Sequence, residues 1–569
     1  MKRLLCLLAL LATSPTPASS QERVTIRVDT NVKRGPMTTM WAWFGYDEPN
    51  YTYMKDGRKL LAELQRLSPV PVYVRTHNLL TSGDGTAALK WGSTNAYTED
   101  ANGNPVYDWT IVDRIIDTYV NLGMKPFVEI GFMPEAMTTH AGPYRHYWKP
   151  GDNYNDIYTG WAYPPKDYGK WSELVYQWVK HSVERYGQTE VESWWWQLWN
   201  EPDIGYWRGT QEEFLKLYDY TVAGVRRALP TARIGGPEVT GPLGQRTQGI
   251  LRNFIEHALR GTNAVTGQVG TPLDVITFHA KGQPRVQPAG CGRDGAPACT
   301  HVRMSVGQQL RAIDNGFRIV ASFLETKRTP IVIGESDPEG CAACPVRTNP
   351  ANVYRNGTMY SSYTAEQITR TYELADLHGV NLLGSVTWAF EFEDQPYFDG
   401  FRDLATNGIN KPVLNVFRML GMMSGDRVAV QSSSGRSAEA VRDSSVTGRP
   451  DIYALATRDA RSAAVLVFNY HDEDLPAPAA AVELTIVGLP AGRPTLTHYR
   501  VDREFGNSYE AWKQLGSPQQ PTAAQYAQLE QASRLHQLER PRQVTVTDGR
   551  VVVPFTLPRQ GVSLIRLTW

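Results

Sequence analysis

The sequence has no excess of charge of either sign, because lysine plus arginine and aspartate plus glutamate each number 58 among its 569 residues. A balanced chain has no electrostatic preference for nucleic acid or for an anionic membrane surface. After the N-terminal segment, it also lacks any apolar run that approaches the roughly 18 residues of a membrane-spanning helix. We therefore predict no nucleic-acid partner and no membrane partner. The oligomeric state stays open, and a monomer is compatible with the sequence.

The motifs of several cofactor and metal enzymes are missing as well. No glycine-rich phosphate loop follows the first predicted strand, which argues against a dinucleotide-binding fold. No His-x-x-x-His pair is present, and Cys341-Ala342-Ala343-Cys344 has no second cysteine pair at zinc-ribbon spacing. A hydrolase that depends on a metal or on a reactive thiol is therefore a disfavoured alternative. We predict no cofactor and no metal.

Cysteine is scarce, with five residues in the whole chain. Cys6 lies in the N-terminal apolar segment, and an even set remains: Cys291, Cys299, Cys341 and Cys344. In an oxidising compartment such a set predicts disulfides that pin loops, and the sequence leaves every pairing open.

The N-terminus has the parts of a secretory signal peptide. Met1-Lys2-Arg3 is basic, residues 4–12 are apolar, and the small residues Ala18-Ser19-Ser20 suit cleavage. We predict a signal peptide over residues 1–20 and a mature protein that is secreted or periplasmic.

Residues 37–411 alternate between strand-like and amphipathic helix-like segments, which is typical of a parallel sheet covered by helices. Eight strand-like segments in this region predict an α/β fold with a (β/α)8 TIM barrel as catalytic domain. A long loop rich in aromatic residues, Met137–Lys166, is predicted to form a wall of the active site. The predicted strands are Thr38–Phe44, Val70–His77, Pro126–Phe132, Ser193–Asn200, Arg233–Pro237, Leu273–His279, Pro330–Gly334 and Leu382–Phe390.

Residues 412–569 change to short alternating strands separated by Gly, Pro and Asp, the pattern of an accessory β-sandwich. A helical insertion is predicted near residues 506–538, because the segment after Pro521-Thr522 has the composition of a helix. The alternating segment within residues 21–36 is predicted to be an N-terminal strand that joins the accessory domain. The predicted strands are Ile452–Ala456, Ala463–Asn469, Val482–Val487, Thr495–Arg500, Val544–Val546 and Val551–Leu557.

The run from Trp194 to Asp203 places a carboxylate at the end of a buried strand. Its aromatic residues predict a strand buried on both faces, and the strand stops at Asn200-Glu201-Pro202 because proline cannot donate to the ladder. Glu335 ends the seventh predicted strand in the same way. The carboxyl ends of barrel strands form the active face, and two carboxylates there indicate a glycosidase.

Further polar and aromatic residues end other predicted strands. Such residues gain nothing from burial in a core, so their gathering at one barrel mouth indicates a binding site. An indole face also stacks on the C–H face of a sugar ring. Besides Glu201 and Glu335 as catalytic residues, we predict these substrate-binding residues: His77, Asn200, His279, Lys281, Asp337, Trp388, Phe390 and Asp394.

Several motifs resemble those of glycoside hydrolase family 39, which holds β-xylosidases and α-L-iduronidases. The resemblance runs from the barrel into the helical insertion and covers nearly all of the mature chain. It rests on Val74-Arg75-Thr76-His77, Trp199-Asn200-Glu201-Pro202-Asp203, Gly235-Gly236-Pro237, Phe278-His279-Ala280-Lys281-Gly282, Glu335-Ser336-Asp337-Pro338, Gly506-Asn507-Ser508-Tyr509-Glu510 and Pro521-Thr522-Ala523.

The resemblance implies a retaining double displacement. Glu335 would be the nucleophile and Glu201 the acid/base, and acid catalysis would require a raised pKa for Glu201. Asn200 would hold the sugar 2-hydroxyl or the nucleophile side, and His77 and His279 would bond sugar hydroxyls.

The choice of sugar depends on a few residues. Lys281 resembles the lysine that the iduronidase branch places near a substrate carboxylate, and Arg402 could assist it. The segment Phe44–Met54 and the loop Met133-Pro134-Glu135 resemble the bacterial β-xylosidases. We predict a β-D-xylosidase that releases xylose from xylooligosaccharides. An α-L-iduronidase or an arabinoside-acting glycosidase is the alternative, and a non-catalytic carbohydrate-binding protein is a distant one.

Overall fold

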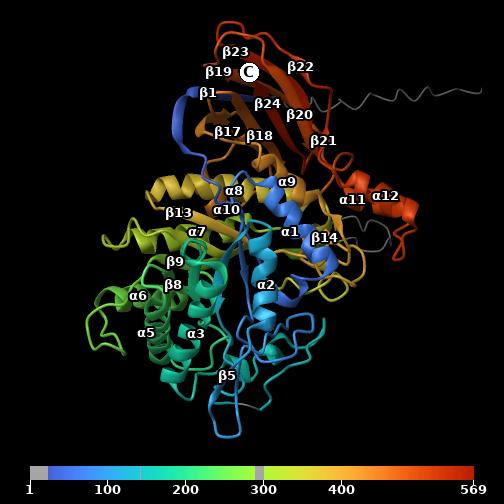
Figure 1. The fold of residues 1–569 in the computed structure, drawn as a ribbon. Helices are drawn as coiled ribbons and strands as arrows, with labels where there is room; N and C mark the ends of the chain where they lie inside the picture. Colours follow the sequence, from blue (N-terminus) through green and yellow to red (C-terminus); the bar gives the residue numbers. More distant parts are fainter. Residues whose placement is uncertain (1–22, 141, 289–299) are drawn as a thin grey trace, which may run out of the picture.

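The computed structural model describes residues 23–140, 142–288 and 300–569. Eight parallel strands close into a barrel in the order β12-β13-β2-β3-β6-β7-β8-β9. Each predicted barrel strand overlaps one of them, so the prediction of a (β/α)8 barrel with a second, mostly β domain is confirmed (Figure 1). The barrel strands are β2 (Trp43–Tyr46), β3 (Tyr73–Thr76), β6 (Lys125–Ile130), β7 (Trp195–Leu198), β8 (Arg233–Val239), β9 (Val275–Lys281), β12 (Ile331–Asp337) and β13 (Leu382–Thr387).

The first barrel strand begins later than predicted. The amide of Ala42 donates to the carbonyl of Thr39, and because of this turn the regular strand begins at Trp43. β13 likewise ends at Thr387, so Trp388 and Phe390 lie in the loop that follows it. Many of the aromatic side chains of the protein pack in its interior. The largest fully buried side chains include Trp41, Trp171, Trp178, Trp194, Trp196, Trp199 and Trp388.

Helices cover the outside of the barrel. α3 begins where the Asp167 carboxylate accepts bonds from the amides of Gly169 and Lys170, and α5 begins with a capping box between Thr210 and Glu213. The helices are α1 (Lys55–Leu67), α2 (Thr110–Asn121), α3 (Tyr168–Tyr186), α4 (Gln188–Glu192), α5 (Gln211–Ala228), α6 (Gln245–Arg260), α7 (Val306–Ala321), α8 (Thr358–His378) and α9 (Pro412–Leu420). The last of these, α9, packs against the barrel wall, where Phe417 meets Phe44 of β2 edge to face.

The helix α8 lies between the barrel and the second domain (Figure 1). It is buried on nearly all sides, although its buried residues include many Thr, Ser, Tyr and Gln side chains. These polar groups weaken its amphipathic pattern, so the sequence predicts this helix only over Thr364–His378. The end is correct and the start is six residues late.

The second domain is built on a ten-stranded sheet in the order β21-β20-β24-β18-β17-β16-β1-β19-β23, with β22 paired to β20. Alternate residues of β18 face different neighbours: Val465 and Val467 face the core within the sheet domain, and Leu466 and Phe468 face the core shared with the barrel. The strands are β16 (Asp426–Ser432), β17 (Asp451–Arg458), β18 (Ser462–Tyr470), β19 (Ala480–Val487), β20 (Thr495–Val501), β21 (His536–Gln537), β22 (Arg542–Gln543), β23 (Arg550–Leu557) and β24 (Val562–Thr568).

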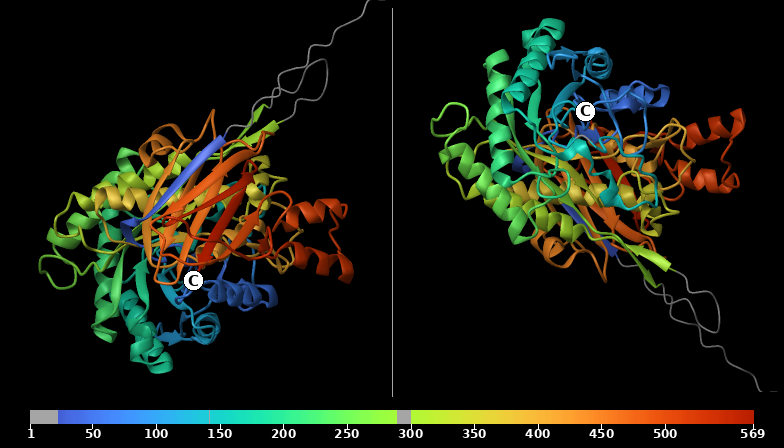
Figure 2. Two further views of the ribbon diagram at one scale, coloured as in Figure 1. Left: turned by 90° about the horizontal axis from the view of Figure 1, so that it is seen from above. Right: turned by 90° about the horizontal axis from the view of Figure 1, so that it is seen from below.

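The N-terminal strand β1 (Arg23–Pro36) lies inside this sheet, between strands from the C-terminal part of the chain (Figure 2). It pairs antiparallel with β16 and parallel with β19. Its buried face, with Val24, Ile26 and Val28, joins the core of the sheet domain. A strand from the N-terminal part of the described chain therefore completes a domain that the C-terminal part mostly forms.

The helical insertion contains α11 (Ser508–Gln514) and α12 (Ala523–Ala532), and it packs on the barrel side of the molecule. Trp512 and Leu529 cluster with Phe398 and Ile409. Residues 544–546, predicted as a strand, do not form a regular one. The amides of Val544 and Val546 nevertheless donate to the carbonyls of Pro494 and Gly492, at 3.0 and 3.1 Å. The sequence also missed β16 and β24.

Two predictions fall partly or wholly outside the described residues. The signal peptide over residues 1–20 lies outside them, as do Cys291 and Cys299. Cys341 and Cys344 form a disulfide. Among the described helices, none has both the length and the apolar character needed to cross a membrane.

Candidate active site

A cavity of about 350 Å³ opens at the carboxyl ends of the barrel strands. It is bordered by both predicted catalytic glutamates and by Tyr154 from the loop Met137–Lys166, as the prediction of an aromatic wall required. The lining residues are Asp47, Lys90, Tyr154, Glu201, Ile204, Tyr206, Thr240, Lys281, Glu335, Gly340 and Cys341.

Glu201 follows β7 in an unusual stretch of backbone. Both Trp199 and Glu201 have positive φ angles, 64° and 43°, a region that costs a side-chain-bearing residue about 1–3 kcal/mol. Surrounding bonds hold them there: the Trp199 indole donates to the carbonyl of Tyr206 at 2.8 Å, and the Glu201 amide donates to the carbonyl of Glu238 at 2.9 Å. The strand end is thus bent so that a carboxylate borders the cavity.

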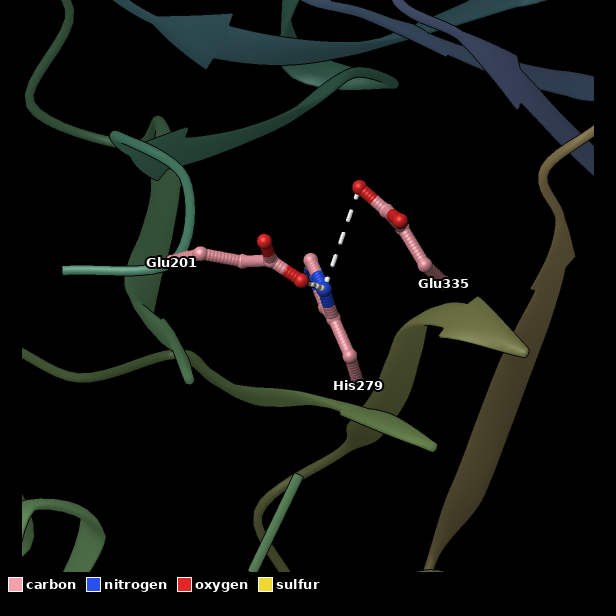
Figure 3. A group of neighbouring side chains, drawn as sticks. All are labelled: Glu201, His279 and Glu335. Carbon is pink, nitrogen blue, oxygen red and sulfur yellow. Dashed lines mark hydrogen bonds and ion pairs between the residues drawn. The ribbon is translucent and has the colours of Figure 1, made fainter. Parts of the chain in front are cut away.

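His279 lies between the two glutamates (Figure 3). Its Nδ1 is 2.9 Å from Glu201 Oε1 and 3.8 Å from Glu335 Oε1, and its Nε2 is 3.0 Å from Glu238 Oε2. Burial alone would lower the pKa of His279, but Glu335, Glu201 and Glu238 outweigh burial and raise it to about 9. With a carboxylate near each ring nitrogen, the imidazolium form of His279 is favoured: Nδ1 hydrogen-bonds Glu201, and Nε2 makes an ion-pair contact with Glu238.

Lys281 bridges the same two glutamates. Its Nζ lies 3.5 Å from Glu201 Oε1 and also bonds Glu335 Oε2. Both carboxylates therefore share one ammonium group, and the three side chains line one cavity.

A fully buried ion-pair network lies below the glutamates. Arg75 contacts Glu129 at 2.8 Å, Glu335 at 3.5 Å and Glu238 at 3.6 Å, and it donates to Asn200 Oδ1 at 3.0 Å. The Nδ2 of Asn200 is buried and has no acceptor among the described residues. One side of the Asn200 amide is thus fixed by Arg75, and the other remains open to a bond.

His77, the residue after the end of β3, joins this network. Its Nδ1 is 2.8 Å from Asp47, and its Nε2 is 3.3 Å from Glu129 and 3.4 Å from Glu335. Burial would lower the pKa of His77, but Glu129 and Asp47 raise it to about 9. The Glu335 carboxylate is therefore surrounded by the cations of Arg75, His77 and Lys281.

These cations decide the ionisation of the glutamates. Burial would raise the pKa of Glu335, but Lys281, His279 and His77 hold it well below the usual range. Burial would also raise the pKa of Glu201, but Lys281 and the bond from His279 bring it below the usual value. The prediction of a raised pKa for Glu201 is therefore wrong for this arrangement, because it ignored the shared lysine.

Sequence reasoning missed several residues of the site. Glu238 lies one residue beyond the predicted fifth strand, and it fits under the site only because residue 334 is glycine: a Cβ there would lie 1.8 Å from the Glu238 carboxylate. Lys90 comes from a loop with no signal of its own, yet it is buried against Asp47, with Nζ 2.5 Å from Oδ2. The cation of Lys90 and that of His77 outweigh burial and hold the pKa of Asp47 well below its usual range.

Trp388 and Asp337 lie beside the network. The Trp388 ring lies 4.4 Å from the His77 ring and 4.9 Å from the Arg75 guanidinium. Gly45 makes room for it, since a Cβ there would lie 2.4 Å from the indole. Asp337 Oδ1 accepts a bond from the Trp388 amide at 3.0 Å, and its Oδ2 lies 3.8 Å from Arg402. Asp337 therefore positions the Trp388 backbone instead of lining the cavity.

Of the eight predicted binding residues, Lys281 alone is among the described residues that line the cavity. Five others lie in or beside the charge network next to it: His77, Asn200, His279, Asp337 and Trp388. Phe390 and Asp394 lie away from both. Phe390 is buried and stacks on Tyr46 at 3.8 Å, which makes it part of the barrel core. Asp394 is exposed, and its amide donates to the side chain of Asn407 in a surface turn. Both follow the end of β13, where the chain leaves the barrel mouth.

Glu201, His279 and Glu335 could in principle offer ligand atoms to a metal ion, since one such atom from each lies within 4.8 Å of the others. A metal-bound histidine must give up its proton. Here the pKa of His279 is raised to about 9, and Lys281 already supplies a positive charge to both glutamates. These donors suit an ion-pair network better than a metal centre.

Comparisons with known proteins agree on one family. Glycosyl hydrolases family 39 matches residues 24–551, a span that contains every motif of the predicted resemblance and confirms it. A β-xylosidase of Geobacillus stearothermophilus is 25% identical over 503 residues, 87% of this chain and 86% of the relative. The α-L-iduronidase of Homo sapiens is 25% identical over 566 residues, 93% of this chain and 76% of the relative.

A solved structure shares the fold along the whole chain. The GH39 enzyme from Xanthomonas axonopodis pv. citri superposes with a TM-score of 0.72 at 21% sequence identity, over 98% of this chain and 99% of that one.

Proposed function

Because the chain belongs to glycosyl hydrolases family 39 and is thus a glycoside hydrolase, we propose that it is a retaining β-D-xylosidase. It would release xylose from xylooligosaccharides, with Glu335 as nucleophile and Glu201 as acid/base. The predicted signal peptide supports export, so the substrate would be met outside the cytoplasm.

The spacing of the glutamates supports retention. A carboxylate oxygen of Glu201 lies within 4.8 Å of one of Glu335. Retaining glycosidases place their carboxyl groups about 5–5.5 Å apart, whereas inverting ones leave about 6.5–9.5 Å for a water. A glycosyl-enzyme formed on Glu335 therefore fits this gap better than direct attack by water.

The charges around Glu335 support its role as the nucleophile, and those around Glu201 support its role as the base of the second step. Glu335 contacts Arg75, His77 and Lys281, so it is ionised, as a nucleophile must be. Within the part of the chain that the structure describes, the ion-pair partners of Glu201 are His279 and Lys281. Glu201 is also the more exposed glutamate, at 8% against 3%. When Glu335 forms the ester, its negative charge is lost. Lys281 then pairs with Glu201 alone and stabilises it as a carboxylate, the form that accepts a proton from water.

The pairing of the cavity lysines supports a neutral sugar. Lys281 is paired with Glu335, and Lys90 is paired with Asp47. Arg402, which could have completed a clamp for a uronate, has no exposed surface and donates to the Trp388 carbonyl at 2.8 Å. The cationic side chains are thus neutralised by carboxylates of the protein itself, and a substrate carboxylate would have to displace one of them.

The test is to measure initial rates on aryl glycosides of β-D-xylose, α-L-iduronic acid and α-L-arabinose, with the product anomer followed by NMR. We expect turnover of the xyloside with retained configuration. Preference for the iduronide would overturn the choice of sugar, and an inverted product would overturn the mechanism.

Two variants test the roles of the glutamates. Glu335→Gln should abolish turnover of every substrate. Glu201→Gln should lose about 10²–10⁴-fold on xylosides with poor leaving groups. On an activated aryl xyloside its first step should survive, because that leaving group needs little protonation. Equal losses on both kinds of substrate would contradict the acid/base role.

A further inference from the structure

A second cavity, of about 310 Å³, lies directly beside the catalytic one. Ile204 lines both cavities, and its side chain is 38% exposed, so the two spaces meet across a single residue. The first turns of α5 and α6 form the far wall, and these helices lie side by side (Figure 1).

The second cavity lies on the side of Glu201. Pro202, the residue after Glu201, lines it, and the Ile204 amide donates to the Glu201 carbonyl at 3.2 Å. In a retaining glycosidase the acid/base residue protonates the oxygen of the leaving group. The part of a substrate beyond that oxygen therefore extends past Glu201, toward Ile204 and this cavity.

The lining has the chemistry of a sugar site. Trp207 and Ile204 supply apolar surface, and Gln211, Gln245, Asn253 and Arg246 supply side chains that bond hydroxyls. The Gln211 Nε2 is buried and has no acceptor within residues 23–140, 142–288 and 300–569. A buried donor without a partner carries a free-energy cost. Rotation of the Gln211 side chain toward the cavity would let a bound hydroxyl remove it.

We propose that this cavity binds the second sugar unit of the leaving group of a neutral xylooligosaccharide. The unit attacked by Glu335 would occupy the catalytic cavity, the next unit would pass over Ile204, and the unit after that would bond Gln211 and Arg246. The inference rests on the proposed function and adds to it a preference for substrates of three or more units.

The experiment compares kcat/KM for an aryl xyloside, xylobiose and xylotriose in the wild type and in Gln211→Ala and Arg246→Ala. Only xylotriose reaches the second cavity. We expect kcat/KM for xylotriose to fall about fivefold or more in each variant, which corresponds to the loss of one hydrogen bond. The aryl xyloside and xylobiose should be hydrolysed as by the wild type. Arg252→Ala is the matched control, because this α6 residue hydrogen-bonds Ser322 and lies outside the cavity lining.

The outcomes separate this inference from the proposed function. An unchanged xylotriose rate in both variants, with an active wild type, would overturn the second site alone. An equal loss on all three substrates would also overturn it, since the residues would then act through the fold. A wild type that hydrolyses no xyloside would overturn the proposed function, and the site for a xylooligosaccharide with it.

Discussion

At the scale of single residues, Lys281 couples the two glutamates of the cavity. Its one ammonium group contacts both carboxylates. Burial would raise the pKa of each, and Lys281 is the largest of the opposing contributions that together bring it below the usual value. A nearby cation favours the ionised form of a carboxyl group. Because the glutamates also repel one another, they titrate as a pair.

Replacing Lys281 with methionine should move the pH profile of kcat/KM to higher pH. Without the cation, the pKa values of Glu335 and Glu201 both rise. The acid limb, where Glu335 must lose its proton, and the alkaline limb, where Glu201 must keep one, therefore shift upward together. The measurement is kcat/KM against pH on a neutral aryl xyloside. Lys180→Met, at an exposed position on α3, is the control and should keep the profile of the wild type. A downward shift for Lys281→Met would contradict this charge assignment.

At the scale of elements, the loop after β12 is held by more than its disulfide. Cys341 lines the catalytic cavity, and Cys341 and Cys344 are bonded to each other. The buried guanidinium of Arg355 donates to the carbonyls of both cysteines, at 2.7 and 3.0 Å, and the Arg402 amide donates to the carbonyl of Ala342 at 3.0 Å. The loop is thus a rigid wall of the site.

The double variant Cys341→Ser/Cys344→Ser should raise KM while changing global stability little. A loop this short contributes at most about 2 kcal/mol through chain entropy. The wall beside the substrate, however, loses one of its fixed points. Steady-state kinetics and urea unfolding check the two parts. A reductant should reproduce the change in KM in the wild type and have no further effect on the variant. A KM unchanged by both treatments would show that the arginines suffice.

At the scale of the whole molecule, one buried charge cluster joins the barrel to the sheet domain. Arg370 of α8 pairs with Glu366 and Glu373 on its own helix, and its guanidinium bonds Asp451 of β17 at 2.5 Å. The side chain of Arg370 is 1% exposed. Removing one partner from such a cluster leaves charges buried without compensation.

Arg370→Met should therefore lower the free energy of unfolding by about 3–5 kcal/mol. Denaturant unfolding followed by fluorescence measures it. Arg260→Met, which breaks the exposed pair of Arg260 with Glu325, is the matched control and should change stability by no more than about 0.5 kcal/mol. Equal effects of the two substitutions would show that the buried cluster does not join the domains energetically.

Local patterns in the sequence were sufficient for the architecture and for the central pair of glutamates. Barrel strands buried on both faces read as apolar runs, and a strand that ends in Asn-Glu-Pro delivers its carboxylate to one edge of the sheet. These are properties of consecutive residues, so they can be read without knowing what lies nearby. The ends of strands and helices were predicted less accurately, as the late start of β2 and the early start of α8 show. Turns and buried polar residues interrupt the hydrophobic periodicity from which these ends are predicted.

Only the tertiary structure decided the electrostatics of the site and the shape of its surroundings. Arg75, Glu238 and Glu335 are far apart in the chain, and closure of the barrel brings Arg75 against both carboxylates. It also brings Lys90 against Asp47. The direction of the Glu201 pKa shift depends on a balance between burial and Lys281, and both are set by distance in space. For the same reason Asp394 is exposed and Ile204 joins two cavities. The identity of a residue determines what chemistry it can do, and its neighbours in the fold determine which chemistry it does.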